Sequence, residues 1–178
     1  MAEFMMPNLK KWMGEIPVLM VHHVHVLVKD VEAIQKSLEG MPGIDSMQLH
    51  DVRRFNGSLA LMVRMKPVSV EFIQIVDPEV GNARLFKDDP LGLNTIDFLV
   101  ADEAAAKEAA QKAGFIIMGE MMIYQCKEIW LRHPELPGMN IEFMVMPPRD
   151  YQPGLDPEKD RAKVWIYGRN GDENLYFE

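Results

Sequence analysis

Apolar and polar residues follow two successive series along the chain. In the first series, four apolar stretches have the length and composition of β-strands: residues 22–28, 46–52, 58–65 and 68–76. After the first stretch, Val31, Ile34 and Leu38 recur at helical spacing, and Asp30 before them is a favourable N-cap residue. The first series therefore predicts a helix over 31–40 and the order β-α-β-β-β.

The second series has the same order. Its apolar stretches are residues 93–100, 115–124, 128–134 and 139–146. An alanine-rich segment over 103–114 follows the first of these, with Asp102 as its N-cap and Gly114 as a natural C-terminal stop. The sequence thus predicts a second β-α-β-β-β unit.

Aligning the two series by their strands gives a register for an internal repeat. It pairs His23 with Thr95, His25 with Asp97, and Glu71 with Glu142. The interval from His23 to Glu71 differs by one residue from the interval between their counterparts. Strand, capped helix and final-strand glutamate are all preserved, so an internal duplication within an α+β fold is the strongest inference.

Ionisable residues interrupt the predicted strands. Successive strand side chains point to opposite faces, so His23 and His25 share one face and His22 is expected on the other. Either the two imidazoles are hydrogen-bonded core residues or they carry chemistry. Glu71 and Glu142 stand in apolar strands, where they either face solvent or, if buried, need a compensating cation.

Composition narrows the class of protein. The chain has 178 residues, 48% of them hydrophobic, and a net charge of −8, which disfavours general binding to nucleic acid or an anionic membrane surface. Its single cysteine, Cys126, excludes an internal disulfide framework and a cysteine-rich zinc site. No signal peptide or membrane span is recognisable, so we expect a cytoplasmic protein without membrane partners.

Four motifs, in order, resemble the vicinal-oxygen-chelate superfamily, which includes glyoxalases, methylmalonyl-CoA epimerases, extradiol dioxygenases and the fosfomycin and bleomycin resistance proteins. These motifs are "HHVHVLVKD", "VEFIQIVDP", "GLNTIDFLVAD" and "WLRHPELPGMNIEFM", within residues 20 to 147. The resemblance implies two βαβββ modules that form an eight-stranded, cup-shaped sheet around a metal ion.

The resemblance also implies a ligand set. Carried over position by position, it assigns His23, Glu71 and Glu142 as metal ligands, and the fourth position, usually histidine, falls on Thr95. One imidazole and two carboxylates suit a divalent ion such as Mn, Co, Ni, Zn, Fe or Mg, whose identity the sequence leaves open. Asp97, two residues after Thr95, lies on the same strand face and is expected to act as ligand, base or hydrogen-bond partner of His25.

The sequence is compatible with three functions. The first is a metal-dependent isomerase, epimerase or lyase that acts beside a carbonyl through an enolate-type intermediate, on a small organic acid or its CoA ester. In that reaction His25, Asp97 and Glu142 are the candidate catalytic residues. The second is a metal-free protein of the same fold that sequesters a ligand. The third, less favoured, is an extradiol-type dioxygenase, because Thr95 removes one of the two histidines that Fe(II) requires.

The expected organisation consists of an N-terminal extension (1–19), a first module (20–76), a linker (77–91), a second module (92–147) and a C-terminal extension (148–172). Residues 173–178, "ENLYFE", resemble the remains of an engineered protease site. The extension ends in an apolar segment, "VWIY", that would be buried on its own core or on a partner. Since short two-module members of the family usually pair, we expect a homodimer that acts on a small molecule.

Overall fold

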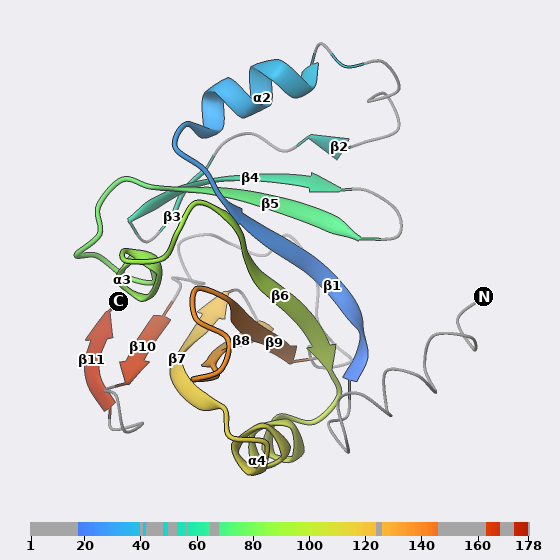
Figure 1. Ribbon diagram of the computed structural model, residues 1–178, viewed down its shortest axis with the longest axis vertical. Helices are drawn as coiled ribbons and strands as arrows, with labels where there is room; N and C mark the ends of the chain where they lie inside the picture. Colours follow the sequence, from blue (N-terminus) through green and yellow to red (C-terminus); the bar gives the residue numbers. More distant parts are fainter. Residues whose placement is uncertain are drawn as a thin grey trace. The chain divides into compact units, whose positions relative to one another are not determined.

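The computed structural model describes residues 18–39, 41, 48–49, 53–55, 57–64, 68–123, 126–145, 163–167 and 173–177. The chain divides into two compact units, which are described separately. The first unit consists of His22–Asp97 with Gly138–Asn140, and the second consists of Phe98–Pro137 and Ile141–Glu178 with Met1–Val21. Figure 1 labels the elements of both.

The first unit contains the first predicted series. Its elements are β1 (Val18–Leu27, from His22 onward), α2 (Val31–Glu39), β2 (Gln48–Leu49), β3 (Arg53–Phe55), β4 (Ser58–Arg64), β5 (Ser69–Ile75), α3 (Ala83–Phe86) and the start of β6 (Gly92–Val100). Neighbouring strands follow the order β6-β1-β5-β4-β2, and β3 also pairs with β4. β1 runs parallel to β5, whereas β4 runs antiparallel to β5, β2 and β3.

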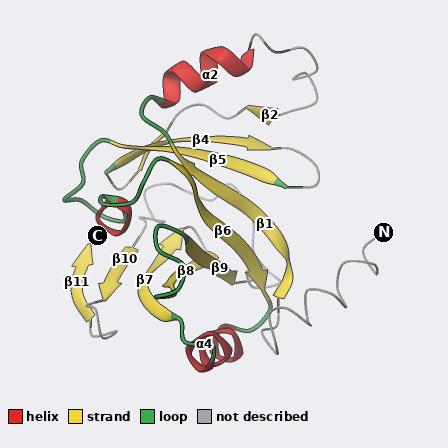
Figure 2. Ribbon diagram, in the orientation of Figure 1, coloured by secondary structure: helices red, strands yellow, loops and turns green. Residues whose placement is uncertain are grey.

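The predicted helix packs as its spacing required. Val31 is fully buried and clusters with Leu61 and Val63 of β4, while Ile34 and Leu38 pack against the same cluster. Figure 2 shows α2 as a helix and β4 as a strand of the sheet. Asp30 caps α2, since its Oδ1 accepts a hydrogen bond of 2.9 Å from the backbone N–H of Ala33. The amphipathic spacing, therefore, is what joins the helix to the sheet.

The second unit contains the second series from Phe98 onward, apart from Gly138–Asn140, because the first strand of that series, β6, begins in the first unit. It comprises α4 (Glu103–Lys112), β7 (Ile116–Ile123), β8 (Cys126–Arg132), β9 (Asn140–Val145, from Ile141 onward), β10 (Lys163–Tyr167) and β11 (Glu173–Phe177). The strands follow the order β11-β10-β7-β8-β9. β10, which contains the whole "VWIY" segment, pairs antiparallel with β7. The burial of its side chains stays a prediction.

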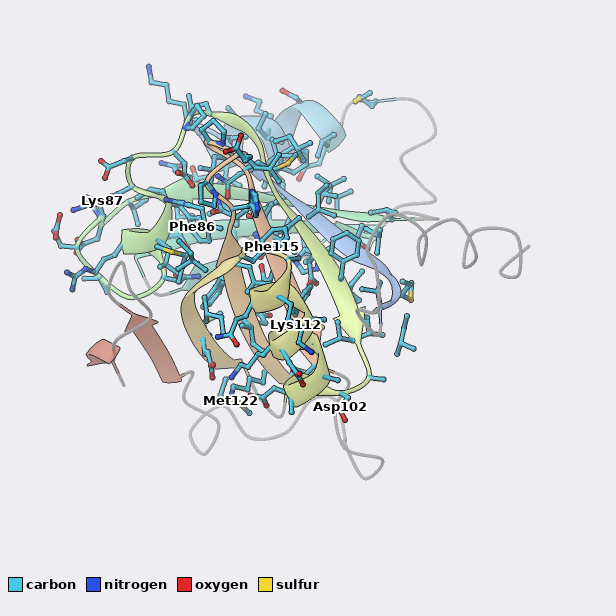
Figure 3. All side chains as sticks on the ribbon, turned by 60° about the horizontal axis from the view of Figure 1, so that its bottom comes forward. Phe86, Lys87, Asp102, Lys112, Phe115 and Met122 are labelled. Carbon is cyan, nitrogen blue, oxygen red and sulfur yellow. The ribbon has the colours of Figure 1, made fainter. Side chains whose placement is uncertain are left out.

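Both ends of α4 confirm the signals in the sequence. Asp102 accepts a hydrogen bond of 2.9 Å from the N–H of Ala105 at the N-terminus of the helix (Figure 3). At the other end, Gly114 has φ +89°, and the N–H of Phe115 donates to the carbonyl of Ala110 over 3.0 Å. This is a Schellman-type stop, for which glycine is the favoured residue.

The α+β class and the two β-α-β-β-β series are confirmed, with seven of the eight predicted strands continuous. The strand predicted over 46–52 is described only at β2, so the eighth strand stays a prediction. Helix α3, within the expected linker, was not predicted. Most of the two expected extensions lies outside the described residues. In the part of the chain that the structure describes, no helix is long and apolar enough to cross a bilayer.

Candidate functional site

Strand register brings three predicted residues together. Parallel pairing of β1 with β5 sets His25 opposite Glu71, and His23, two residues earlier, shares the face of His25. Glu71 Oε2 lies 3.1 Å from His25 Nε2 and 3.5 Å from His23 Nε2, and the two Nε2 atoms are 2.6 Å apart. We call His23 Nε2, His25 Nε2 and Glu71 Oε2 the inner triad.

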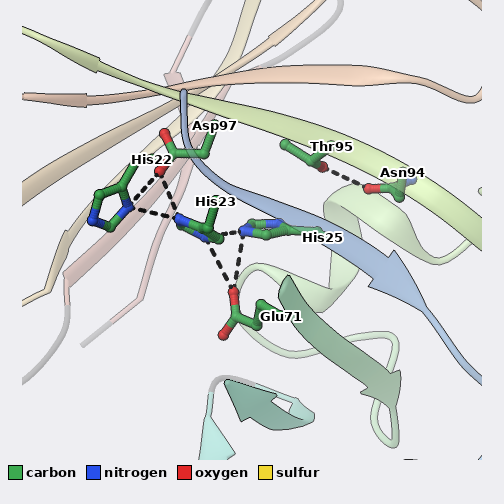
Figure 4. A network of polar contacts seen from close by, with 7 residues as sticks. All are labelled: His22, His23, His25, Glu71, Asn94, Thr95 and Asp97. Atoms are coloured by element: carbon green, nitrogen blue, oxygen red, sulfur yellow. Dashed lines mark hydrogen bonds and ion pairs between the residues drawn. The ribbon is translucent and has the colours of Figure 1, made fainter. Parts of the chain in front are cut away.

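Strand β6 supplies Asp97 on the other side of the His23 ring (Figure 4). Asp97 Oδ2 accepts a hydrogen bond of 2.8 Å from His23 Nδ1 and lies 3.1 Å from His22 Nδ1. The two Nδ1 atoms are themselves 2.8 Å apart. We call His22 Nδ1, His23 Nδ1 and Asp97 Oδ2 the outer triad, because 40% of the His22 side chain is exposed whereas His23 and Asp97 are buried.

His22 is the member of this cluster that strand alternation did not predict. Neighbouring strand residues point to opposite faces, which predicted that His22 would turn away from His23. Its exposure agrees with that expectation, but its imidazole bends back to Asp97. The triplet of histidines in the sequence was the only available signal.

Two carboxylates on either side of one imidazole dominate the electrostatics. Burial by itself lowers the pKa of His23, but the hydrogen bonds and charges of Asp97 and Glu71 outweigh it and raise the pKa to about 10. Burial likewise would raise the pKa of Glu71, yet hydrogen bonds from His23 and His25 hold it well below its usual range. The pKa of Asp97 is lowered despite burial, through hydrogen bonds from His22 and His23. Without a metal ion, His23 is therefore an imidazolium held between two anions.

Each triad also has the donor chemistry of a divalent metal site, with two imidazoles and one carboxylate. Three ligand atoms on one face of an octahedron, bonded at about 2.1 Å, lie about 3.0 Å apart. The separations are 2.6 to 3.5 Å in the inner triad and 2.8 to 3.1 Å in the outer triad. The residues present therefore fit such an ion.

A separate buried network holds the residue at the unusual fourth position. The Thr95 hydroxyl donates to Asn94 Oδ1 over 2.8 Å, and Asn140 Nδ2 donates to the same oxygen over 3.1 Å. Both amides also donate to Asp89 Oδ2, over 2.9 Å from Asn94 and 3.0 Å from Asn140. Because a carboxylate only accepts, Asp89 fixes the orientation of both amides. The Thr95 hydroxyl thus uses its single proton in the hydrogen bond to Asn94 and has no second proton to donate.

The remaining predicted site residue belongs to the other unit. Glu142 is fully buried in β9, which answers the question of whether it faces solvent. Its role as a metal ligand or catalytic carboxylate stays a prediction. His133, expected to be a loop residue without chemistry, accepts a hydrogen bond from the N–H of Glu135 and packs edge-on against Phe115.

The sequence profile of the Glyoxalase/Bleomycin resistance protein/Dioxygenase superfamily matches residues 22–127. The chain belongs to this superfamily. The match spans β1 to the start of β8 and so includes both triads. No curated protein sequence matches the chain significantly.

Several solved structures of this superfamily's fold are similar. The methylmalonyl-CoA epimerase of Mycobacterium tuberculosis has a TM-score of 0.60 and 14% identity, over 76% of this chain and 93% of that chain. A Streptomyces coelicolor methylmalonyl-CoA epimerase in complex with 2-nitronate-propionyl-CoA has a TM-score of 0.57 and 12% identity, over 72% and 94%. A hypothetical protein of Bacillus halodurans gives 0.57 and 13%, over 75% and 98%. At these identities the likeness confirms the fold alone.

Proposed function

We propose that the chain is a metal-dependent isomerase, epimerase or lyase that moves a proton beside a carbonyl through an enolate-type intermediate. Its substrate would be a small organic acid or a CoA ester of one. The observation that carries this proposal is the inner triad, in which two paired strands bring three ligand atoms together. The epimerase structures of the same fold support it as an analogy.

His23, His25 and Glu71 would hold the ion. In this arrangement the Nδ1–H of His23 donates a hydrogen bond to Asp97, and Nε2 would be free to bind the ion. This is the usual carboxylate–histidine–metal arrangement. Asp97 is then a positioning residue that fixes the tautomer and the ring plane. A bound divalent ion would supply Lewis acidity, which lowers the cost of negative charge next to a carbonyl.

Glu142 is our candidate for the group that moves the proton. The repeat register pairs it with Glu71, and a fully buried carboxylate without solvent is the kind of group whose basicity an active site adjusts. With His25 as the third ligand, Glu142 is left for proton transfer. The two roles separate in experiment, because loss of a ligand removes metal whereas loss of a base does not.

The test uses tag-free protein, metal analysis and proton exchange. We expect about one divalent ion per chain at the inner triad after dialysis against Mn, Co, Ni or Zn, and metal-dependent deuterium incorporation into methylmalonyl-CoA in D₂O. Glu71→Gln should lose the ion of the inner triad together with exchange, whereas Glu142→Gln should keep that ion and lose exchange. Metal-loaded protein that exchanges no proton in this ester or in the free acid would exclude the proposal for this substrate class.

A metal-free ligand-binding protein is the second candidate, and one observation favours it. The His23 imidazolium already compensates the charges of Glu71 and Asp97, so the cluster needs no ion to be stable. In that case the cup would sequester a ligand and would stay metal-free through the same dialysis. An extradiol-type dioxygenase is a third candidate, since His25 in the inner triad would replace the histidine that Thr95 removes. Oxygen uptake by Fe(II)-loaded protein with a catechol tests it.

We further propose a cytoplasmic homodimer. The support is the family habit of pairing and an apolar C-terminal segment that forms strand β10. Light scattering after removal of residues 173–178 tests the assembly, and a monomer at micromolar concentration would contradict it.

A further inference from the structure

The reaction proposed above uses the Nε2 atom of His23 as a ligand and the hydrogen bond from His23 Nδ1 to Asp97 for positioning, but His22 has no part in it. We propose that His22, His23 Nδ1 and Asp97 form a second binding site for a divalent transition-metal ion. The ligand class is a borderline ion such as Zn²⁺, Co²⁺ or Ni²⁺, because two of the three donors are imidazole nitrogens. The proposal concerns a site additional to that of the inner triad and does not require that site to be catalytic.

The first support is geometric. His22 and His23 are consecutive in β1, and strand alternation would separate their rings. Instead, both Nδ1 atoms converge on one oxygen of Asp97, and the three atoms form a nearly equilateral triangle with sides of 2.8, 2.8 and 3.1 Å. This matches the face of an octahedral ion more closely than the inner triad does.

The second support is an oxygen without a hydrogen bond. Asp97 is fully buried, and among the described residues its Oδ1 has no hydrogen-bond partner, although both imidazoles crowd its Oδ2. A buried carboxylate oxygen that makes no hydrogen bond costs free energy. A cation bound at Oδ2 that also contacts Oδ1 would satisfy it, because carboxylates bind ions with one oxygen or with both.

Access distinguishes the two triads. The most exposed side chain of the outer triad is His22, at 40%, and that of the inner triad is Glu71, at 22%. The outer triad is therefore the more open of the two to an ion from solution. Since each triad takes a different nitrogen of His23, an ion at the outer triad also displaces the hydrogen bond from His23 to Asp97 that would position the inner one. We therefore expect excess Zn²⁺ to disturb the inner site.

The test removes one triad at a time and measures binding of the metal alone. His25→Ala/Glu71→Gln eliminates two inner ligands and leaves the outer triad intact. Isothermal titration with Zn²⁺ should give one ion per chain, and Co²⁺ should show visible absorption bands. Adding His22→Ala should weaken Zn²⁺ binding by about 100-fold or more, because even the loss of a hydrogen-bond partner of a ligand costs about 10- to 100-fold. His133→Ala, which removes a histidine outside both triads, should change nothing.

The outcomes separate this inference from the proposed function. If the inner variant binds no metal while His22→Ala alone still binds one ion, the outer site is excluded and the inner one stands. If the inner variant binds one ion and His22→Ala binds none, the outer site stands and the proposed metal function fails. Equal Zn²⁺ affinity of the inner variant with and without His22→Ala also excludes the outer site. Should the double variant not fold, His25→Ala alone gives the same comparison.

Discussion

Each unit of the chain contains a partly buried cluster of charged side chains, and the two clusters differ in kind. The histidine cluster of the first unit consists of His22, His23, His25, Glu71 and Asp97. The lysine–glutamate cluster of the second unit consists of Glu103, Lys107, Glu120 and Lys127. In the latter, Lys127 Nζ lies 2.6 Å from Glu103 and 2.5 Å from Glu120, and Lys107 contacts both glutamates as well.

The difference lies in what can replace the positive charge. Lys107 and Lys127 are the cations of their cluster, and their ammonium groups only donate. Burial lowers the pKa of Lys127, but the hydrogen bonds of Glu103 and Glu120 raise it well above its usual range. The positive charge of the histidine cluster is a proton on His23, which a metal ion can displace. Similar charge balance therefore produces a structural element in one unit and a chemical site in the other.

Metal affinity should show the largest difference between the two clusters. Glu71→Gln in the histidine cluster should reduce affinity for Co²⁺ or Zn²⁺ at the inner triad by about 100-fold or more, since a direct ligand is lost. Glu120→Gln is the matched control in the lysine–glutamate cluster and should leave affinity unchanged. Titration calorimetry measures both. Equal losses in the two variants would show that the metal effect is a general consequence of unfolding.

The next largest effect should appear in stability. Glu120 has a side chain 9% exposed, whereas Lys107 and Lys127 are 23% and 25% exposed. Glu120→Ala leaves two lysines without one of their carboxylates, and their partial exposure softens the loss. We expect a destabilisation of about 2 kcal/mol, between the values for exposed and buried pairs. Urea unfolding measures it, and metal affinity should not change.

The sequence predicted the strands that carry the site better than it predicted the contacts between their side chains. Internal repetition and strand alternation placed His23, His25 and Glu71 on predicted strands, and parallel pairing of β1 with β5 then brought them together. Alternation failed for His22, because a side chain with two rotatable bonds can return past its own backbone to a neighbouring strand. Alternation also suggested His25 as a partner of Asp97, whereas Asp97 Oδ2 lies within hydrogen-bond distance of His22 and His23.

The network around Thr95 was beyond sequence reasoning for a different reason. Asn94 adjoins Thr95 in the chain, but Asp89 precedes β6 and Asn140 begins β9. Nothing local in the sequence indicates that two amides and a hydroxyl share these acceptors. Such networks depend on how loops return, and amphipathic periodicity carries no information on loops.

The pH dependence of the free energy of unfolding should also distinguish the two clusters, with an effect of intermediate size. In chelator-treated protein, His23 has a pKa of about 10, against about 6.5 when unfolded. A raised pKa contributes stability fully below about pH 6.5 and loses it as the pH rises towards 10. The lowered pKa of Glu103 acts in the opposite direction, and its contribution is lost only as the pH falls through the acid range.

Thermal unfolding between pH 7 and 9 therefore reports the histidine cluster. We expect Tm to fall by roughly 5 °C over this window in metal-free protein, at about 2 to 4 °C per kcal/mol for a chain of this size. Asp97→Asn should flatten the slope, because His23 loses one of its two anions. With metal bound the slope should decrease or reverse, since a neutral His23 is then the ligand and binding releases its proton. An identical slope in Asp97→Asn would contradict the assignment to His23.

The smallest expected effect concerns the residue that stands where the family usually has histidine. Thr95→Val removes the hydroxyl that donates to Asn94 Oδ1, but that oxygen keeps its bond from Asn140. The loss should therefore be about 1 kcal/mol, and Thr95→Ser, which keeps the donor, should lose less. Thr95→His should tighten metal binding if this position faces the ion, although a fully buried site has little room for the larger ring and stability should fall. Calorimetric metal affinity and urea unfolding separate these two consequences. If Thr95→His folds and its metal affinity is unchanged, position 95 is not a ligand position in this chain. Residue 95 would then serve the hydrogen-bond network of Asp89 and Asn94, and the histidine cluster alone would define the site.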